Sequence, residues 1–128
     1  MNAKEVRQIG NVMPTATREN PNQGRVYRID GLAPTITDVS GGGGRQPMII
    51  VSAGGKQRIR KLTPLECWRL MDFSEEDFRK AESVNSNTQL YKQAGNSIVK
   101  NVLIAVFGQM IPGADGVYKN IQRKEISK

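Results

Sequence analysis

The 128-residue sequence contains no histidine and only one cysteine, Cys67. The lack of histidine removes the commonest general base and metal ligand, and a single cysteine forms neither an intramolecular disulfide nor a metal site by itself. No apolar run approaches the length of a membrane span, and the N-terminus lacks the apolar core of a signal peptide. We therefore expect a protein of the reducing cytoplasm that has no disulfide and no metal site.

The basic residues are concentrated in the N-terminal half of the chain. Residues 1–62 carry ten lysines and arginines against four acidic residues, residues 63–97 carry four against six, and residues 98–128 carry five against two. This distribution of the net charge of +7 indicates a surface that faces phosphate groups. Ordinary basic surface is an alternative that charge alone leaves open.

The residues before Leu62 predict irregular β structure and loops, because glycine, proline, asparagine and threonine dominate there. A strand is expected at 25–29, where polar and apolar residues alternate, and another at 48–51, where the run is continuously apolar. Segments 1–24 and 38–46 are expected to be the most mobile. This half has the composition of a small, loop-rich sheet.

The residues after Leu62 predict about four helices, and the first three have clear start signals. The first is expected at 63–71, with Thr63 as N-cap, proline in the first helical position and Glu66 as the capping-box partner. Ser74 starts a second helix, and a third begins at Ser86 and ends at Gly95. The expected fold class is therefore α+β, with an irregular β and loop N-terminal half followed by helices.

The fourth helix is expected to begin at Asn96 or Ser97 and to end before Pro112. Its apolar residues form a broad stripe made of Ile98, Val99, Val102, Leu103, Val106, Phe107 and Met110. Gly95, Asn96 and Ser97 would then lie at a helix N-terminus, where free N–H groups and partial positive charge suit a carboxylate or phosphate. Judged from the residues alone, a plain junction between two helices is the favoured interpretation.

The glycine run 41–44, followed by Arg45, is a second candidate for binding phosphate. Its backbone could approach phosphate groups closely, with further charge from Lys56, Arg58, Arg60 and Lys61. The spacing matches neither a Walker loop nor a dinucleotide-binding loop. A flexible hairpin tip is an equally good interpretation.

Cys67 is the only cysteine nucleophile that the chain could offer. It lies inside the first predicted helix beside Trp68, with no histidine to activate it, so a buried, inert thiol is expected. Glu66 and Arg69 are three residues apart and are expected to pair along the same helix.

Two segments resemble conserved blocks of one enzyme family. Residues 60–73, RKLTPLECWRLMDF, resemble motif IX of the DNA (cytosine-5) methyltransferases, and residues 89–103, QLYKQAGNSIVKNVL, resemble motif X. They stand in the order and at the close spacing usual for the family. Upstream, residues 31–37 and the glycine run resemble the end of the target-recognition region, with Thr35-Ile36 where the family has Thr-Leu. The resemblance extends from Ile9 to Met110 and identifies the chain as a C-terminal portion of such an enzyme.

The sequence departs from the family pattern at three positions. Asp72 stands where motif IX usually has glycine, and Ser74 stands where it usually has proline. Lys100 places a charge on a helix face that is usually apolar. We therefore expect local differences in the turn after the first helix.

The family resemblance implies a fold in which DNA lies between a large Rossmann-like cofactor domain and a small recognition domain. Residues 1–58 would belong to the recognition region, residues 59–112 would pack on the cofactor domain, and residues 113–128 would form a charged tail. The implied DNA-binding residues are Thr35, Ile36, Gly42, Gly43 and Arg45. The implied structural organisers are Arg60, Thr63, Glu66 and Arg69. The implied contacts with S-adenosylmethionine are Gly95, Asn96 and Ser97.

The chain lacks the family's Pro-Cys motif, whose cysteine attacks C6 of cytosine, and its Glu-Asn-Val motif. The family chemistry also uses a glycine-rich cofactor loop and a Gln-Arg-x-Arg block. Without the nucleophile the chain is expected to be inactive alone, and to bind S-adenosylmethionine weakly or not at all.

The expected partners are double-stranded DNA and a polypeptide that carries the missing motifs, with self-association through helix 97–111 as a further expectation. The origin would be bacterial or phage, and the function DNA methylation of the kind found in restriction-modification systems. The alternatives are a non-enzymatic DNA-binding or interaction module and a degenerate remnant of such an enzyme.

Overall fold

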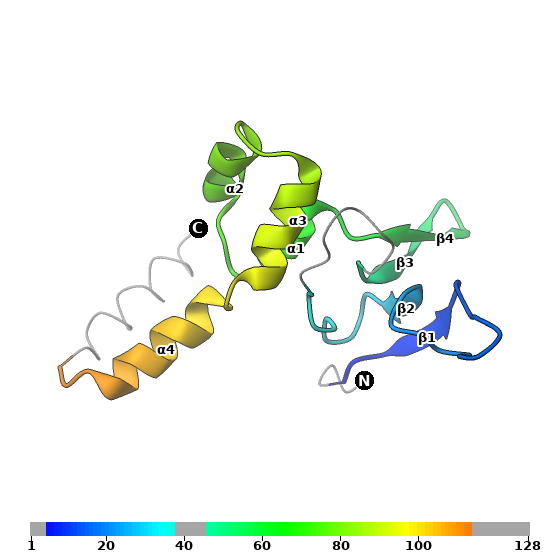
Figure 1. The fold of residues 1–128 in the computed structure, drawn as a ribbon, viewed down its shortest axis with the longest axis horizontal. Helices are drawn as coiled ribbons and strands as arrows, with labels where there is room; N and C mark the ends of the chain where they lie inside the picture. The colour runs from blue at the N-terminus through cyan, green and yellow to red at the C-terminus, as the bar shows by residue number, and fades with distance from the viewer. Residues whose placement is uncertain (1–4, 38–45, 114–128) are drawn as a thin grey trace.

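The computed structural model describes residues 5–37 and 46–113, so the glycine run 41–44 and the charged tail lie outside the described residues. A small sheet forms one side of the molecule and three packed helices, α1 to α3, form the other (Figure 1). The helix α4 extends away from both (Figure 1). The predicted α+β class is confirmed.

The sheet has four strands in the order β1-β2-β3-β4. The strands are β1 (Gln8–Asn11), β2 (Arg25–Arg28), β3 (Met48–Ala53) and β4 (Lys56–Lys61). The pairs β1–β2 and β3–β4 are antiparallel, whereas β2 and β3 are parallel. A parallel pair cannot be joined by a tight turn, so the chain between Arg28 and Met48 must cross over before it returns to the sheet.

The two strands expected from the sequence, β2 and β3, are confirmed, and two more strands flank them. The strand β1, which was not predicted, lies within the segment 1–24 that was expected to be mobile, and it pairs with β2. All six residues of β4 are exposed, so this strand has no apolar face that a sequence pattern could reveal. Its pairing with β3 is set by Gly54 and Gly55, whose φ angles of 57° and 73° suit a two-residue hairpin turn.

Four helices follow the sheet, as predicted. They are α1 (Pro64–Leu70), α2 (Glu75–Glu82), α3 (Asn87–Asn96) and α4 (Lys100–Met110). The first three begin where the sequence indicated, because the side chains of Thr63, Ser74 and Ser86 each accept a hydrogen bond from the backbone N–H three residues later.

The predicted start of α4 is wrong. Asn96 is the last residue of α3 and Ser97 is its C-cap, whereas α4 begins at Lys100 after Val99, with no side-chain cap. The backbone N–H and the Oγ of Ser97 both donate to the carbonyl oxygen of Ala94, at 3.2 and 2.8 Å. Serine therefore satisfies the end of one helix here instead of starting the next, a role that its short hydroxyl side chain allows equally well.

A single hydrophobic core joins the helices to the sheet. Its buried members are Leu62, Cys67, Trp68, Phe78, Leu90 and Ala94. Ile36 and Ile49, from the N-terminal half of the chain, pack against this core. Two hydrogen bonds hold α3 in place: the Nε1 of Trp68 on α1 donates to the carbonyl of Leu90 at 2.9 Å, and the hydroxyl of Tyr91 donates to the carbonyl of Leu62, between β4 and α1, at 2.7 Å.

The end of α1 is a Schellman motif, which is usually built around glycine. The N–H of Phe73 donates to the carbonyl of Trp68 at 3.1 Å, and the N–H of Asp72 donates to that of Arg69 at 3.0 Å. The rings of Phe73 and Trp68, 5.1 Å apart, supply the hydrophobic contact of this motif. Asp72 has a φ of 62° and is the only non-glycine residue in the described part of the chain with positive φ. The turn thus keeps the left-handed geometry despite the departure from the family's glycine.

Replacing Asp72 with glycine is expected to stabilise the protein by about 0.5–1 kcal/mol, because glycine adopts positive φ without steric cost. The gain is limited by the greater entropy of glycine in the unfolded chain. Asp72→Ala is the matched control and should destabilise by about 1 kcal/mol, since alanine lacks the tolerance of aspartate for this conformation. Urea denaturation measures both changes, and equal midpoints for the two variants would contradict the strain at this position.

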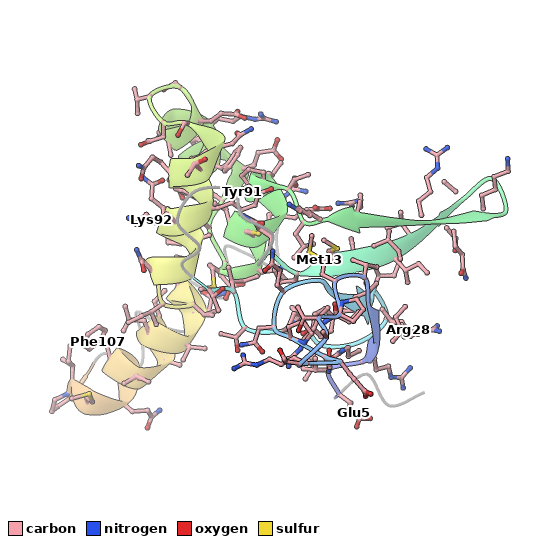
Figure 2. The ribbon with its side chains drawn as sticks, turned by 45° about the vertical axis from the view of Figure 1, so that its right-hand side comes forward. Glu5, Met13, Arg28, Tyr91, Lys92 and Phe107 are labelled. Atoms are coloured by element: carbon pink, nitrogen blue, oxygen red, sulfur yellow. The ribbon has the colours of Figure 1, made fainter. Side chains whose placement is uncertain are left out.

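The apolar residues of α4 are largely exposed. The helix has no buried residue, and Val102, Val106, Phe107 and Met110 are between 48% and 70% exposed. Figure 2 shows Phe107 well separated from the sheet and from Tyr91 on α3. Within the described residues, no helix is both long enough and apolar enough to cross a bilayer.

Candidate nucleic-acid interface

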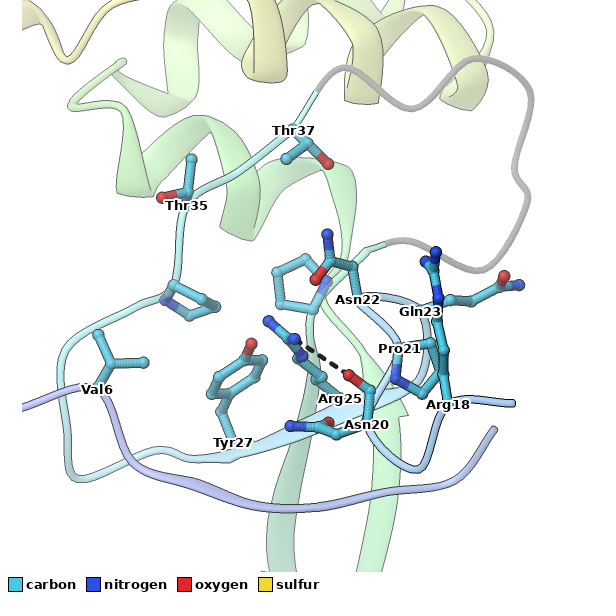
Figure 3. Close-up of a pocket in the computed structure, with 12 residues that line it drawn as sticks. Val6, Arg18, Asn20, Pro21, Asn22, Gln23, Arg25, Tyr27, Thr35 and Thr37 are labelled. Atoms are coloured by element: carbon cyan, nitrogen blue, oxygen red, sulfur yellow. Dashed lines mark hydrogen bonds between the residues drawn. The ribbon is translucent and has the colours of Figure 1, made fainter. Parts of the chain in front are cut away.

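An open hollow of about 880 Å³ lies between β2, the loop before it and the segment around Thr35 (Figure 3). Its polar lining consists of Arg18, Asn20, Asn22, Gln23, Arg25, Tyr27, Thr35 and Thr37. No lining residue is acidic. Guanidinium, amide and hydroxyl groups are the side chains that donate to phosphate oxygens and to base edges, so the chemistry of the hollow suits nucleic acid.

The loop that forms one wall of the hollow is held by side-chain amides. Gln8 Nε2 donates to the Oδ1 of Asn20 at 2.6 Å, and Asn11 Nδ2 donates to the carbonyl of Pro21 at 2.8 Å. Gly24 has a φ of 82°, and a Cβ there would lie 2.6 Å from the Oδ1 of Asn11. The loop therefore needs glycine at this position to lie against β1.

The sheet orients the side chain of Arg25, and the described residues accept from only some of its hydrogen-bond donors. Residues two apart on a strand share a face, so Arg25 and Tyr27 both face the hollow. The Nη2 of Arg25 donates to the carbonyl of Asn20 at 3.1 Å (Figure 3), whereas its buried Nε has no acceptor among the described residues. The guanidinium thus retains donor capacity beyond the single bond that positions it.

The structure separates the predicted DNA-contact residues into three groups. Thr35 and Thr37 have exposed side chains on the wall of the hollow (Figure 3). Ile36, between them, packs against the helical core, so a contact of this residue with DNA would come from its backbone. The other predicted contacts, Gly42, Gly43 and Arg45, lie outside the described residues.

Half of the residues that line the hollow had no indication in the sequence, because they lie in the segment 1–24 that was expected to be mobile. One signal was available. The alternation in Arg25-Val26-Tyr27 predicts that Arg25 and Tyr27 share one face of the strand, opposite the face that carries Val26. The loop residues Asn20 and Gln23 had no comparable pattern.

Glu66 is the centre of the predicted structural organisers. Its two carboxylate oxygens accept from Arg60 at 2.7 and 2.8 Å, and Oε2 also accepts from the backbone N–H of Thr63 at 2.7 Å. These hydrogen bonds lower the pKa of Glu66 from 4.5 to about 2, and the bond from Arg60 has the largest effect. The Arg60 contact ties β4 to the start of α1, which fixes the sheet against the helices.

The predicted pair between Glu66 and Arg69 is wrong. The carboxylate of Glu66 turns back to the N-cap and to Arg60, so it does not point along the helix toward Arg69. Arg69 instead binds Glu75 on α2 at 2.6 Å. Both partners are exposed, and such pairs contribute little to stability.

Gly95, Asn96 and Ser97, the predicted cofactor contacts, lie together at the C-terminal end of α3. This location reverses the electrostatic argument made from the sequence. A helix C-terminus presents carbonyl oxygens and partial negative charge, which suit a cation and not a carboxylate or phosphate. Ser97 Oγ is engaged with Ala94, while Asn96 is exposed.

Cys67 is fully buried in the core. Burial raises the pKa of its thiol to about 12, so the thiolate needed for nucleophilic attack is absent at neutral pH. The expectation of a buried thiol is confirmed.

Comparison with known proteins gives consistent matches. A family model for the C-5 cytosine-specific DNA methylases matches residues 2–112. The orphan methyltransferase M.Rho11sI of Bacillus phage rho11s is 44% identical over 108 residues, covering 84% of this chain and 20% of that protein. The orphan methyltransferase M.SPBetaI of Bacillus phage SPbeta is 39% identical over 131 residues, covering 68% of this chain and 29% of that protein. The type II methyltransferase M.HhaI of Haemophilus parahaemolyticus is 39% identical over 82 residues, covering 62% and 22%.

Proposed function

This chain belongs to the C-5 cytosine-specific DNA methylase family, and we propose that it supplies DNA recognition and one edge of the cofactor pocket as the C-terminal portion that carries motifs IX and X. The chain spans less than a third of the length of the phage relatives that it matches. The reaction in which it would take part moves a methyl group from S-adenosylmethionine to C5 of cytosine in DNA.

One observation carries the proposal. The segments that resemble motifs IX and X pack on each other around Trp68, and Ile36 anchors the wall of the donor-lined hollow to this same core. The proposed DNA-contacting surface and the proposed cofactor-contacting helix end would thereby share one packed core. Such an arrangement suits an enzyme that must position DNA and cofactor relative to each other.

On the DNA side, Thr35 and Thr37 would contact the backbone, and Arg18, Asn22 and Gln23 would reach base edges or phosphates from the opposite wall of the hollow. Their exposure and donor chemistry support these roles. Gly42, Gly43 and Arg45 would extend the same contact along the backbone.

On the cofactor side, Gly95, Asn96 and Ser97 would form one edge of the pocket. When bound, S-adenosylmethionine supplies an activated methyl group carried on a cationic sulfonium. The C-terminal end of α3 fits the cationic character of this molecule, because its carbonyl dipoles favour positive charge. The exposed amide of Asn96 could bond a polar group of the cofactor, while Gly95 leaves room for close approach.

The chain alone offers no catalytic nucleophile. It has no Pro-Cys or Glu-Asn-Val motif, and Cys67 is buried with a raised pKa. A Gln-Arg-x-Arg sequence does occur, at residues 57–60, but it lies on the exposed β4 strand and its second arginine is bound to Glu66. Arginines cannot replace the thiolate, so methyl transfer requires a further polypeptide segment.

The exposed face of α4 is the surface through which that segment would pack. Val102, Val106, Phe107 and Met110 expose an apolar stripe that water does not favour. A cofactor domain would cover it in the complete enzyme. A second copy of the chain through helix 97–111 is the other occupant that the sequence suggested.

We expect methyl transfer only when the chain is mixed with the rest of the enzyme. The test uses the relative from Bacillus phage rho11s with the region that matches this chain deleted, and measures transfer of labelled methyl groups from S-adenosylmethionine to duplex DNA. Neither polypeptide should be active alone, and the mixture should produce 5-methylcytosine. Phe107→Asp should abolish the restored activity, because it places a charge in the apolar contact, whereas Gln109→Asp, on the same helix, should preserve it.

Activity of the chain alone would overturn the proposed role. Failure of the mixture would remove the subunit reading, and salt-sensitive DNA binding without restored activity would then support the non-enzymatic DNA-binding alternative.

A further inference from the structure

We propose that the β3–β4 hairpin is a second, separate contact with the DNA backbone, made by Lys56 and Arg58. The inference rests on the proposed function as a DNA-contacting chain. Lys56 and Arg58 lie outside the hollow and outside the segments that resemble motifs IX and X, and the sequence offered them only as further charge beside the glycine run.

The hairpin extends beyond the rest of the sheet. The strand β2 pairs with β3 only as far as Ile50, so residues 51–53 and 56–58 pair with each other and, in the described part of the chain, with no third strand. Figures 1 and 2 show this two-stranded arm pointing away from the helices. A projecting two-stranded ribbon has the width to lie along or within a DNA groove.

Strand register places the two basic residues on a defined face of the arm. Lys56, Arg58 and Arg60 alternate along β4 and therefore share one face, while Gln57, Ile59 and Lys61 share the other. Arg60 binds Glu66 of α1. The face that carries Lys56, Arg58 and Arg60 is therefore the one directed toward the helices.

The same face carries the hollow. Ile49 is paired with Tyr27 on one side and with Arg60 on the other, which puts these three residues on one face of the sheet. Tyr27 and Arg25 line the hollow. DNA seated over the hollow would therefore continue across the face that presents Lys56 and Arg58.

The charge of the arm is not neutralised within the described protein. Lys56 and Arg58 are exposed and form no ion pair among the described residues, in contrast to Arg60. The sequence from Met48 to Lys61 contains no acidic residue. Flexible, unpaired cations on a projecting arm fit a partner with a regular array of negative charges, and duplex DNA carries one about every 1.7 Å along its axis.

The experiment measures the salt dependence of binding of the full chain to a labelled DNA duplex between about 50 and 200 mM salt. Lys56→Gln/Arg58→Gln should lower the slope of log K against log salt by about 1.8, since each lost phosphate contact lowers it by about 0.9. The loss should be the same on duplexes of unrelated sequence, because backbone contacts carry no sequence information.

The matched control is Lys61→Gln/Lys92→Gln, which removes the same charge from the opposite face of β4 and from α3. It should change the slope by much less. If the unaltered chain binds and both double variants change the slope equally, the arm has no special role and the inference is overturned. If the unaltered chain fails to bind duplex DNA at low salt, the proposed DNA contact fails as well. Circular dichroism confirms that each variant is folded.

Discussion

Replacing Trp68 with alanine is expected to lower the free energy of unfolding by about 3–5 kcal/mol, the usual cost of removing a buried tryptophan. The Trp68 ring lies 5.1 Å from Phe73 and 5.6 Å from Phe78, centroid to centroid, and its Nε1 donates to the carbonyl of Leu90. Since a domain is stable by about 5–15 kcal/mol in total, the variant should lose a large part of its stability and unfold at a much lower urea concentration. Urea denaturation followed by far-ultraviolet circular dichroism measures the loss.

Two controls separate packing from hydrogen bonding at this position. Trp68→Phe keeps an aromatic ring but leaves the buried carbonyl of Leu90 without its donor, so a loss of about 1–3 kcal/mol is expected. Leu70→Ala, at a site on the same helix that is 39% exposed, should cost much less. A Trp68→Ala variant no less stable than Leu70→Ala would show that the core is not organised around this ring.

Replacing Glu66 with glutamine is expected to destabilise the protein by about 1.5–3 kcal/mol at pH 7, the range for hydrogen bonds to a charged group. The carboxylate accepts two bonds from Arg60 and one from the backbone of Thr63. Glutamine offers one acceptor oxygen and turns an N–H₂ group toward a guanidinium, so the bidentate contact is lost. The same urea measurement applies.

The pH dependence gives an independent test of Glu66. Its pKa is lowered from 4.5 to about 2 in the folded protein, so its contribution is fully present above pH 4.5 and is lost as the pH falls toward 2. The unaltered chain should lose stability over this window, and Glu66→Gln should lose less, so the two should converge in acid. Glu82→Gln removes an exposed partner of Arg79 and is the matched control. A constant difference between the unaltered chain and Glu66→Gln from pH 7 to pH 2.5 would contradict the assignment.

The parts of the fold that the sequence predicts are those with local causes. The starts of α1, α2 and α3 depend on Thr63, Ser74 and Ser86, each of which bonds a backbone group only three residues away. Such signals lie within one turn of helix and are therefore readable from a short window. The apolar exposure of α4 was likewise expected from its stripe.

The parts that the sequence did not predict are of two kinds. Some depend on contacts between residues far apart in the chain, and another depends on a residue that could cap either of two neighbouring helices. The strand β4 exists because β3 lies beside it, and Glu66 binds Arg60 because the sheet brings that arginine to the helix start. Ser97 could cap either helix by its chemistry, and the bond to Ala94 decided for the earlier one. The hollow combines residues from four separate stretches, which no single window reveals.

The parallel pairing of β2 with β3 determines where residues can be added to this protein. Backbone pairing places Val26 of β2 beside Met48 of β3, but this pairing does not fix the length of the crossover that joins the two strands. Each doubling of a flexible connection costs only about 0.6 kcal/mol, so residues inserted there at a distance from Ile36, which packs on the helical core, would leave the strands and that core in place. On the proposed function, a longer crossover would change the surface offered to DNA while the paired strands on either side of it stay in place.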